Sequence, residues 1–101
     1  MSQMQNESVI KDRYMYAEPP MYNVVFLDDD VTTVQFVEAV LIHHFGKSKK
    51  QAKQIVDTIN TAHRAVVGTF YQDIAETKAK LVIDIARENN YPFQAITEEV
   101  E

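Results

Sequence analysis

The chain contains no cysteine and no tryptophan, and it has only 2 glycines and 3 prolines among its 101 residues. Without cysteine, disulfides, thiolate zinc sites and cysteine nucleophiles are excluded, so this small protein must be stabilised by packing alone. Long apolar runs are also missing, because none approaches the roughly 20 residues that a membrane span needs. The N-terminus lacks the basic and then apolar regions of a signal peptide. These absences predict a cytoplasmic protein without membrane contact.

Positive charge is scarce as well. There are 10 lysines and arginines against 15 aspartates and glutamates, which gives a formal net charge of -5. An acidic protein repels phosphate backbones and anionic lipid surfaces, so neither nucleic acid nor a membrane is an expected partner. The lysines between positions 47 and 53 form a local basic stretch. This stretch has no interleaved aromatic residues and is typical of a solvated helix face.

Apolar residues make up 46% of the sequence and recur in short periodic runs after about position 20. This amount and this length fit one domain with a modest core. Residues 1–20 are polar and end in Glu18-Pro19-Pro20. They predict a flexible N-terminal extension, followed by a single domain over residues 21–101.

The apolar periodicity predicts six elements in the order strand, helix, helix, strand, helix, strand. Thr32 with Gln35 and Ser48 with Gln51 match the capping box that opens a helix, and Gly46 suits the end of the first helix. The order predicts an α+β fold in which three helices pack on a small three-stranded antiparallel sheet. The expected strands are 21–27, 65–70 and 93–97, and the expected helices are about 32–45, 48–62 and 73–89.

The sharpest local feature is the run Asp28-Asp29-Asp30-Val31-Thr32 at the exit of the first strand. It matches the D-x-D-x-T pattern of haloacid-dehalogenase-type phosphatases, in which the first aspartate attacks phosphorus beside magnesium. That enzyme also needs a downstream lysine, further acidic residues and a larger parallel scaffold. No catalytic residue, cofactor or metal site is therefore expected. Because adjacent carboxylates repel one another, the run instead suggests a site for a cation such as a peptide ammonium.

From Pro19 to Ile96 the chain resembles the ClpS family of adaptors for the ATP-dependent Clp protease. The resemblance depends on motifs that occur in the same order at nearly constant spacing. These motifs are Pro19-Pro20-Met21-Tyr22, Asp28-Asp29-Asp30-Val31-Thr32, Phe36-Val37, Gly68-x-Phe70, Ala75-Glu76-Thr77-Lys78, and Ala86-Arg87-Glu88-Asn89 with Pro92 behind it.

The resemblance implies a bacterial cytoplasmic adaptor that binds the free α-amino group and bulky hydrophobic first residue of N-degron substrates. It also implies docking on the N-terminal domain of the ClpA unfoldase of the ClpAP protease, without catalysis. Transferred position by position, the amine-binding residues are Asp28, Asp30 and Asn60. The same transfer gives the pocket residues Thr32, Val34, Val37, Val56, Ile59 and Phe93, and the unfoldase-docking residues Asp73, Glu76 and Lys78.

Three of these positions depart from the family pattern. Asp28 stands where Asn is usual, Asn60 where His is usual, and Val34 where Met is usual. Asp28 adds a negative charge for an ammonium, and Asn60 still offers an amide oxygen as acceptor. The shorter Val34 predicts a wider pocket mouth that tolerates a first residue such as Ile or Val. The alternative is a paralogue that docks on the unfoldase without binding N-degrons.

Overall fold

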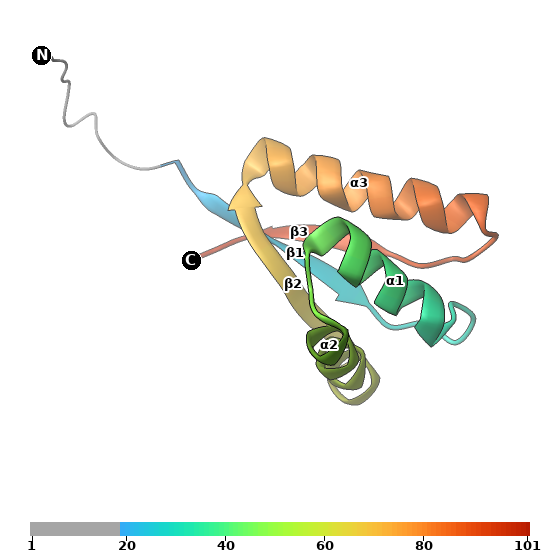
Figure 1. The fold of residues 1–101 in the computed structure, drawn as a ribbon. Helices are drawn as coiled ribbons and strands as arrows, with labels where there is room; N and C mark the ends of the chain where they lie inside the picture. The colour runs from blue at the N-terminus through green and yellow to red at the C-terminus, as the bar shows by residue number, and fades with distance from the viewer. Residues whose placement is uncertain (1–18) are drawn as a thin grey trace, which may run out of the picture.

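The computed structural model describes residues 19–101, so most of the predicted extension over residues 1–20 lies outside the described part. The described chain forms its elements in the predicted order (Figure 1). Their bounds are β1 Met21–Leu27, α1 Val34–Phe45, α2 Lys49–Ala62, β2 Arg64–Tyr71, α3 Gln72–Glu88 and β3 Ala95–Glu99.

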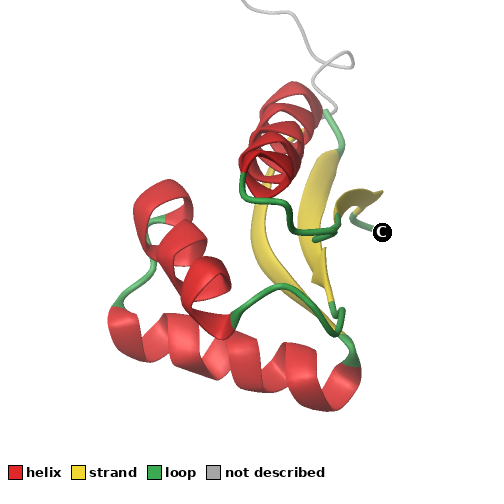
Figure 2. Ribbon diagram, turned by 90° about the vertical axis from the view of Figure 1, so that its right-hand side faces the viewer, coloured by secondary structure: helices red, strands yellow, loops and turns green. Residues whose placement is uncertain are grey.

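β1 is the central strand of the sheet, whose order is β2-β1-β3. Both neighbours run antiparallel to it, with Phe26 opposite Ala65 on β2 and opposite Ala95 on β3. The helices lie on one side of this sheet (Figure 2). The predicted α+β class with three helices and a three-stranded antiparallel sheet is confirmed. None of the helices in residues 19–101 is long and apolar enough to cross a membrane.

The core lies between the sheet and the helices, and aromatic rings join its parts. Phe26 on β1 is 0% exposed and meets Phe45 and Phe93 edge to face, at ring-centroid distances of 5.4 and 4.9 Å. Such edge-to-face pairs add to the stabilisation that burial of the rings provides. Phe93 follows the last helix, so its ring ties the C-terminal segment to the end of β1.

The first helix begins one residue later than the capping pattern predicts. Its N-cap is Thr33, whose hydroxyl accepts the backbone N–H of Phe36 at 3.2 Å. Thr32 does not cap the helix, because its hydroxyl donates to the carboxylate of Asp29 instead. The second capping box is confirmed: Ser48 and Gln51 exchange the two expected hydrogen bonds.

The last strand is displaced from its predicted position at 93–97 to Ala95–Glu99. The apolar pattern included Phe93 in the strand, but this residue lies in the loop before it and is 2% exposed. Its burial arises from the core contact with Phe26 rather than from sheet pairing. At the other end, Glu98 belongs to the strand and pairs with Arg64 of β2.

Candidate functional site

A hollow opens where β1 ends, between the turn that follows it, the start of α1 and the C-terminal half of α2. Its volume is about 330 Å³, including space open to solvent. A hollow this small suits a single side chain with its backbone amine rather than a large molecule. The residues that line it are Leu27, Asp28, Asp29, Thr32, Val34, Val37, Val56, Ile59, Asn60 and Phe93.

The floor of the hollow is apolar and well buried. Val37, Val56 and Ile59 are 8%, 7% and 5% exposed, and Phe93 beneath them is held by its ring contact with Phe26. Val34 has an exposed fraction of 44%, which places it at the rim. The six positions expected to form the pocket are therefore all brought together around one hollow.

The turn after β1 is organised by the carboxylate of Asp29. Its Oδ1 accepts the backbone N–H groups of Val31 at 2.8 Å and Thr32 at 2.7 Å, and its Oδ2 accepts the Thr32 hydroxyl at 2.8 Å. Partial burial alone raises the pKa of Asp29, but these hydrogen bonds outweigh it and hold the pKa below its usual value. The carboxylate is thus fixed as an anion at the wall of the hollow.

Asp28 lies at the same wall and is tied to the end of α2. Its backbone N–H donates to the carbonyl of His63 at 3.1 Å, and its Oδ2 lies 3.2 Å from the His63 Nδ1. Asn60 lies one helical turn before His63 and also lines the hollow. Two of the three predicted amine-binding residues, Asp28 and Asn60, therefore line the same hollow from separate elements.

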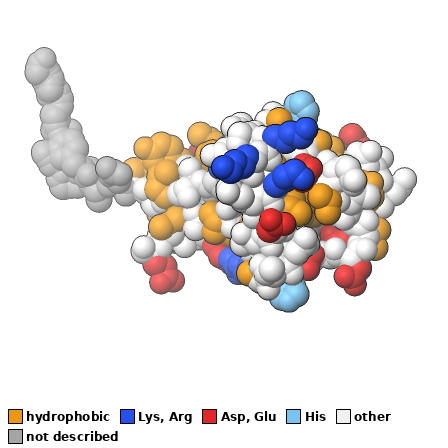
Figure 3. All heavy atoms as spheres, turned by 60° about the horizontal axis from the view of Figure 1, so that its bottom comes forward, with side chains coloured by type: hydrophobic (Ala, Val, Ile, Leu, Met, Phe, Trp, Pro, Cys, Tyr) orange, Lys and Arg blue, Asp and Glu red, His pale blue; other side chains and the backbone are white. Residues whose placement is uncertain are grey.

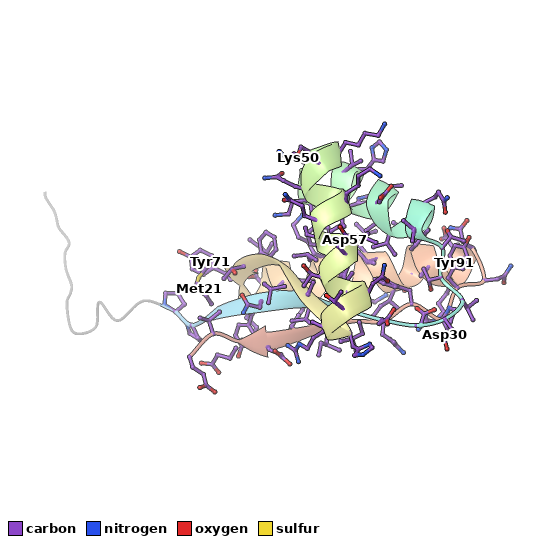
Figure 4. The ribbon with its side chains drawn as sticks, turned by 90° about the horizontal axis from the view of Figure 1, so that it is seen from below. Met21, Asp30, Lys50, Asp57, Tyr71 and Tyr91 are labelled. Carbon is purple, nitrogen blue, oxygen red and sulfur yellow. The ribbon has the colours of Figure 1, made fainter. Side chains whose placement is uncertain are left out.

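The third predicted amine-binding residue, Asp30, is exposed and is not among the residues that line the hollow. Figure 4 shows it on the turn after β1, at the end of the sheet opposite Met21 and Tyr71. Asp29 takes its place in the lining. Sequence reasoning passed over Asp29, although an aspartate three residues before Thr32 is the arrangement of a side chain that bonds its own turn. The amine-binding role of Asp30 therefore stays a prediction, whereas the carboxyl residues that line the hollow are Asp28 and Asp29.

An anionic rim above an apolar floor can hold an ammonium group and a hydrophobic side chain that are joined to each other. Carboxylates accept charge-assisted hydrogen bonds from an ammonium, and the floor removes the side chain from water. The D-x-D-x-T chemistry is not supported by this geometry. Asp28, the required nucleophile, is bonded to His63, and the sheet is antiparallel instead of parallel.

The predicted docking residues lie near the start of α3, at the far end of the sheet from the hollow (Figure 4). Asp73 and Glu76 are exposed there. Lys78 is partly buried: its Nζ donates to the carbonyl of His44 at 3.0 Å and lies 5.3 Å from the centroid of the Phe45 ring. Lys78 therefore joins α3 to the end of α1, a structural role that sequence reasoning did not predict.

The basic stretch lies on α2. Lys49, Lys50 and Lys53 are exposed, and Figure 3 shows lysine and arginine side chains grouped on this face. The residues that line the hollow include none of these lysines. Their position agrees with the prediction of a solvated helix face.

Comparisons with a family model and with known proteins all match this chain to one family. The family model for the "ATP-dependent Clp protease adaptor protein ClpS" matches residues 17–96. The ClpS adapter protein of Ruegeria pomeroyi is 41% identical over 90 residues, which cover 89% of this chain and 80% of that protein. The ClpS adapter protein of Treponema denticola is 38% identical over 98 residues, which cover 97% of this chain and 95% of that protein.

A solved structure has the same fold. It is Agrobacterium tumefaciens ClpS2 bound to L-phenylalaninamide, with a TM-score of 0.80 and 36% sequence identity. The similarity covers 82% of this chain and 100% of the solved one. The complete domain of that protein thus corresponds to the described part of this chain.

Proposed function

Because the chain belongs to the ClpS family of ATP-dependent Clp protease adaptors, we propose that its hollow binds the free α-amino group and first side chain of N-degron substrates. The chain is an adaptor and not an enzyme, since the family is non-catalytic. In this proposal the adaptor delivers bound substrates to the ClpA unfoldase in the bacterial cytoplasm. The setting agrees with the bacterial origin of its relatives.

The observation that carries the proposal is that two acidic residues, Asp28 and Asp29, line one hollow with a buried apolar floor. The ligand of the related Agrobacterium protein, L-phenylalaninamide, has the chemistry that such a hollow recognises. An amino-acid amide is a first residue with a free amine, a side chain and a carbonyl that continues as an amide. The acidic residues of the hollow match the amine, and the apolar floor matches the side chain.

In this proposal three side chains bind the amine together. Asp28 and Asp29 supply the negative charge, and the amide oxygen of Asn60 supplies a neutral acceptor from α2. An ammonium has three N–H donors, so three acceptors arranged around it satisfy all of them. A buried ammonium without such partners is costly, which makes a free and charged chain start the condition for binding.

The width of the mouth sets the preference for the first side chain. Val34 at the rim is 44% exposed and is shorter than the methionine usual in the family. A β-branched first residue carries its bulk at Cβ, next to the amine. A shorter rim residue leaves room for that bulk, so we propose that Ile and Val are accepted beside Leu and Phe.

The proposed docking surface lies near Asp73 and Glu76, close to the start of α3, and its partner is the N-terminal domain of the ClpA unfoldase. β1 has 7 residues and separates this surface from the hollow; at about 3.3 Å per residue the two lie about 20 Å apart. This spacing lets substrate and unfoldase bind at the same time. Pro19 and Pro20, the first residues that the structure describes, lie beside Tyr71 and Asp73 and so next to the proposed docking surface.

One observation favours the paralogue that docks without binding N-degrons. The Asp28 carboxylate already has a partner in His63, at 3.2 Å. If that contact neutralised the charge of Asp28, the hollow would attract an ammonium less strongly. It leaves one Asp28 oxygen and the whole Asp29 charge at the rim, which is why we favour amine binding.

A nuclear magnetic resonance titration with L-phenylalaninamide tests the proposed site directly. We expect the largest backbone amide shifts at residues 28–34 and 56–60, which surround the hollow. Shifts confined to the start of α3 would assign binding to another surface. The absence of shifts at saturating ligand would show that the hollow does not bind the amine.

A further inference from the structure

His63 adopts a backbone conformation that histidine seldom takes. It is the C-cap of α2, with φ 67° and ψ 3°, in the left-handed region where glycine usually stands at a helix end. Only His63 and Asn90 among the described non-glycine residues have positive φ. Unfavourable backbone conformations of this kind gather at functional sites, so the imidazole needs an explanation.

The imidazole contacts the residue that we assign to the amine. His63 Nδ1 lies 3.2 Å from Asp28 Oδ2, and the His63 carbonyl accepts the Asp28 N–H at 3.1 Å. Asp28 is therefore held at both its backbone and its side chain by one residue. The His63 side chain is 78% exposed and that of Asp28 30% exposed, so the imidazole exchanges protons with solvent while the carboxylate faces the hollow.

We propose that His63 is a positioning residue that makes amine binding depend on pH. The neutral imidazole donates from Nδ1 to one Asp28 oxygen and leaves the other for the substrate ammonium. The protonated imidazole keeps that hydrogen bond but brings a positive charge next to the ammonium, which repels it. This inference rests on the proposed function, because it requires that the hollow binds an amine.

The other charged groups near this end of α2 are carboxylates and one arginine. Asp29 and Asp30 follow Asp28 in the turn, and hydrogen bonds from Val31 and Thr32 hold the pKa of Asp29 below its usual value. Arg64 is next in the chain and pairs with Glu98 of β3; this hydrogen bond holds the pKa of Glu98 below its usual value. Histidine is the side-chain type whose charge ordinarily changes between about pH 5 and pH 8, which is why the test varies pH in this range.

The test measures the affinity of a fluorescent peptide starting with Leu at about pH 5.5 and pH 7.0, where its amine stays protonated. Wild type is compared with His63→Asn, which tolerates the left-handed backbone and keeps a donor, and with His63→Gly, which removes the donor. His43 and His44 are present in all three proteins and control for other histidines.

We expect wild-type affinity to rise about three- to tenfold from the lower to the higher pH. We expect the affinity of both variants to stay constant within about twofold, with His63→Asn the tighter binder of the two because its side chain still holds Asp28. An equal rise in wild type and His63→Asn overturns the role of His63 while leaving amine binding intact. Absence of peptide binding by wild type at both pH values overturns the proposed function itself and this inference with it.

Discussion

Asp29 binds Thr32 through both of its carboxylate oxygens. The Thr32 backbone N–H donates to Oδ1 at 2.7 Å, and the Thr32 hydroxyl donates to Oδ2 at 2.8 Å. This double contact explains why α1 begins at Val34 with Thr33 as its cap, and why a charged group is fixed at the wall of the hollow. The same pair thus shapes the turn and supplies part of the proposed amine site.

Removing the Asp29 carboxylate should destabilise the protein. Asp29→Ala loses three hydrogen bonds, and we expect the free energy of unfolding to fall by about 1–3 kcal/mol. The matched variant Asp30→Ala changes an exposed side chain and should cost less than about 0.5 kcal/mol. Urea unfolding of the three proteins measures both values, and equal losses would show that Asp29 does not organise the turn.

The contribution of Asp29 should also depend on pH. Because its pKa is lowered in the folded state, the stability that it adds is present above the pKa of the unfolded chain. That stability is lost as the pH falls through the lower, folded value. The difference in unfolding free energy between wild type and Asp29→Asn should therefore be constant near neutrality and shrink below about pH 4. A difference that grows on acidification would contradict this assignment.

Neutralising Asp28 should weaken the binding of a free amine. Asp28→Asn preserves the shape of the side chain but removes its charge, so we expect peptide affinity to fall about tenfold, equivalent to about 1.4 kcal/mol. Asp30→Asn changes a residue of the same turn that does not line the hollow, so we expect peptide affinity to change less than about twofold. Fluorescence anisotropy with one peptide that starts with Leu measures the affinities of wild type and of both variants. A larger loss in Asp30→Asn would return the amine contact to Asp30.

Restoring the family's methionine at the rim should narrow the choice of first residue. In Val34→Met we expect affinity for peptides starting with Ile or Val to fall about tenfold relative to Leu and Phe. Val31→Met is the control, since Val31 is 60% exposed and does not line the hollow. Unchanged ratios in Val34→Met would mean that Val34 does not set the width of the mouth.

Lys78 should contribute more to stability than a typical surface lysine. Lys78→Met loses a hydrogen bond to the His44 carbonyl and the contact with the Phe45 ring, and we expect a loss of about 1–2 kcal/mol. Lys80→Met breaks an exposed pair with Asp84 and should cost about 0.5 kcal/mol or less. Thermal unfolding ranks the two variants. Measuring unfoldase binding only for variants that remain folded separates a docking defect from a stability defect.

Local chemistry in the sequence was enough to predict most of the fold. The apolar alternation of residues 21–27, the capping box at Ser48 and the left-handed glycine at position 46 each fixed an element boundary that the structure confirms. These features depend on neighbours within a few residues, and so a single sequence contains them. The order of the elements followed from the same signals.

The errors arose where distant residues decide the outcome. Phe93 resembles a strand residue, but its burial depends on Phe26 of β1. Three adjacent aspartates also do not reveal which of them line the hollow, because this depends on how the turn folds against α2; the amine-binding role of Asp30 stays a prediction. The roles of His63 and Lys78 likewise arise from contacts with segments 35 and 34 positions away.

Recognition of a protonated amine by the acidic rim is the central property proposed for this protein, and comparing one peptide with its N-acetylated form tests it directly. Acetylation removes the charge and adds bulk at the amine while leaving the first side chain in place. We predict that a Phe-starting peptide binds at least about a hundredfold more tightly than its acetylated form, equivalent to about 2.7 kcal/mol. Equal affinities for the two peptides would contradict the assignment of the hollow to an amino terminus.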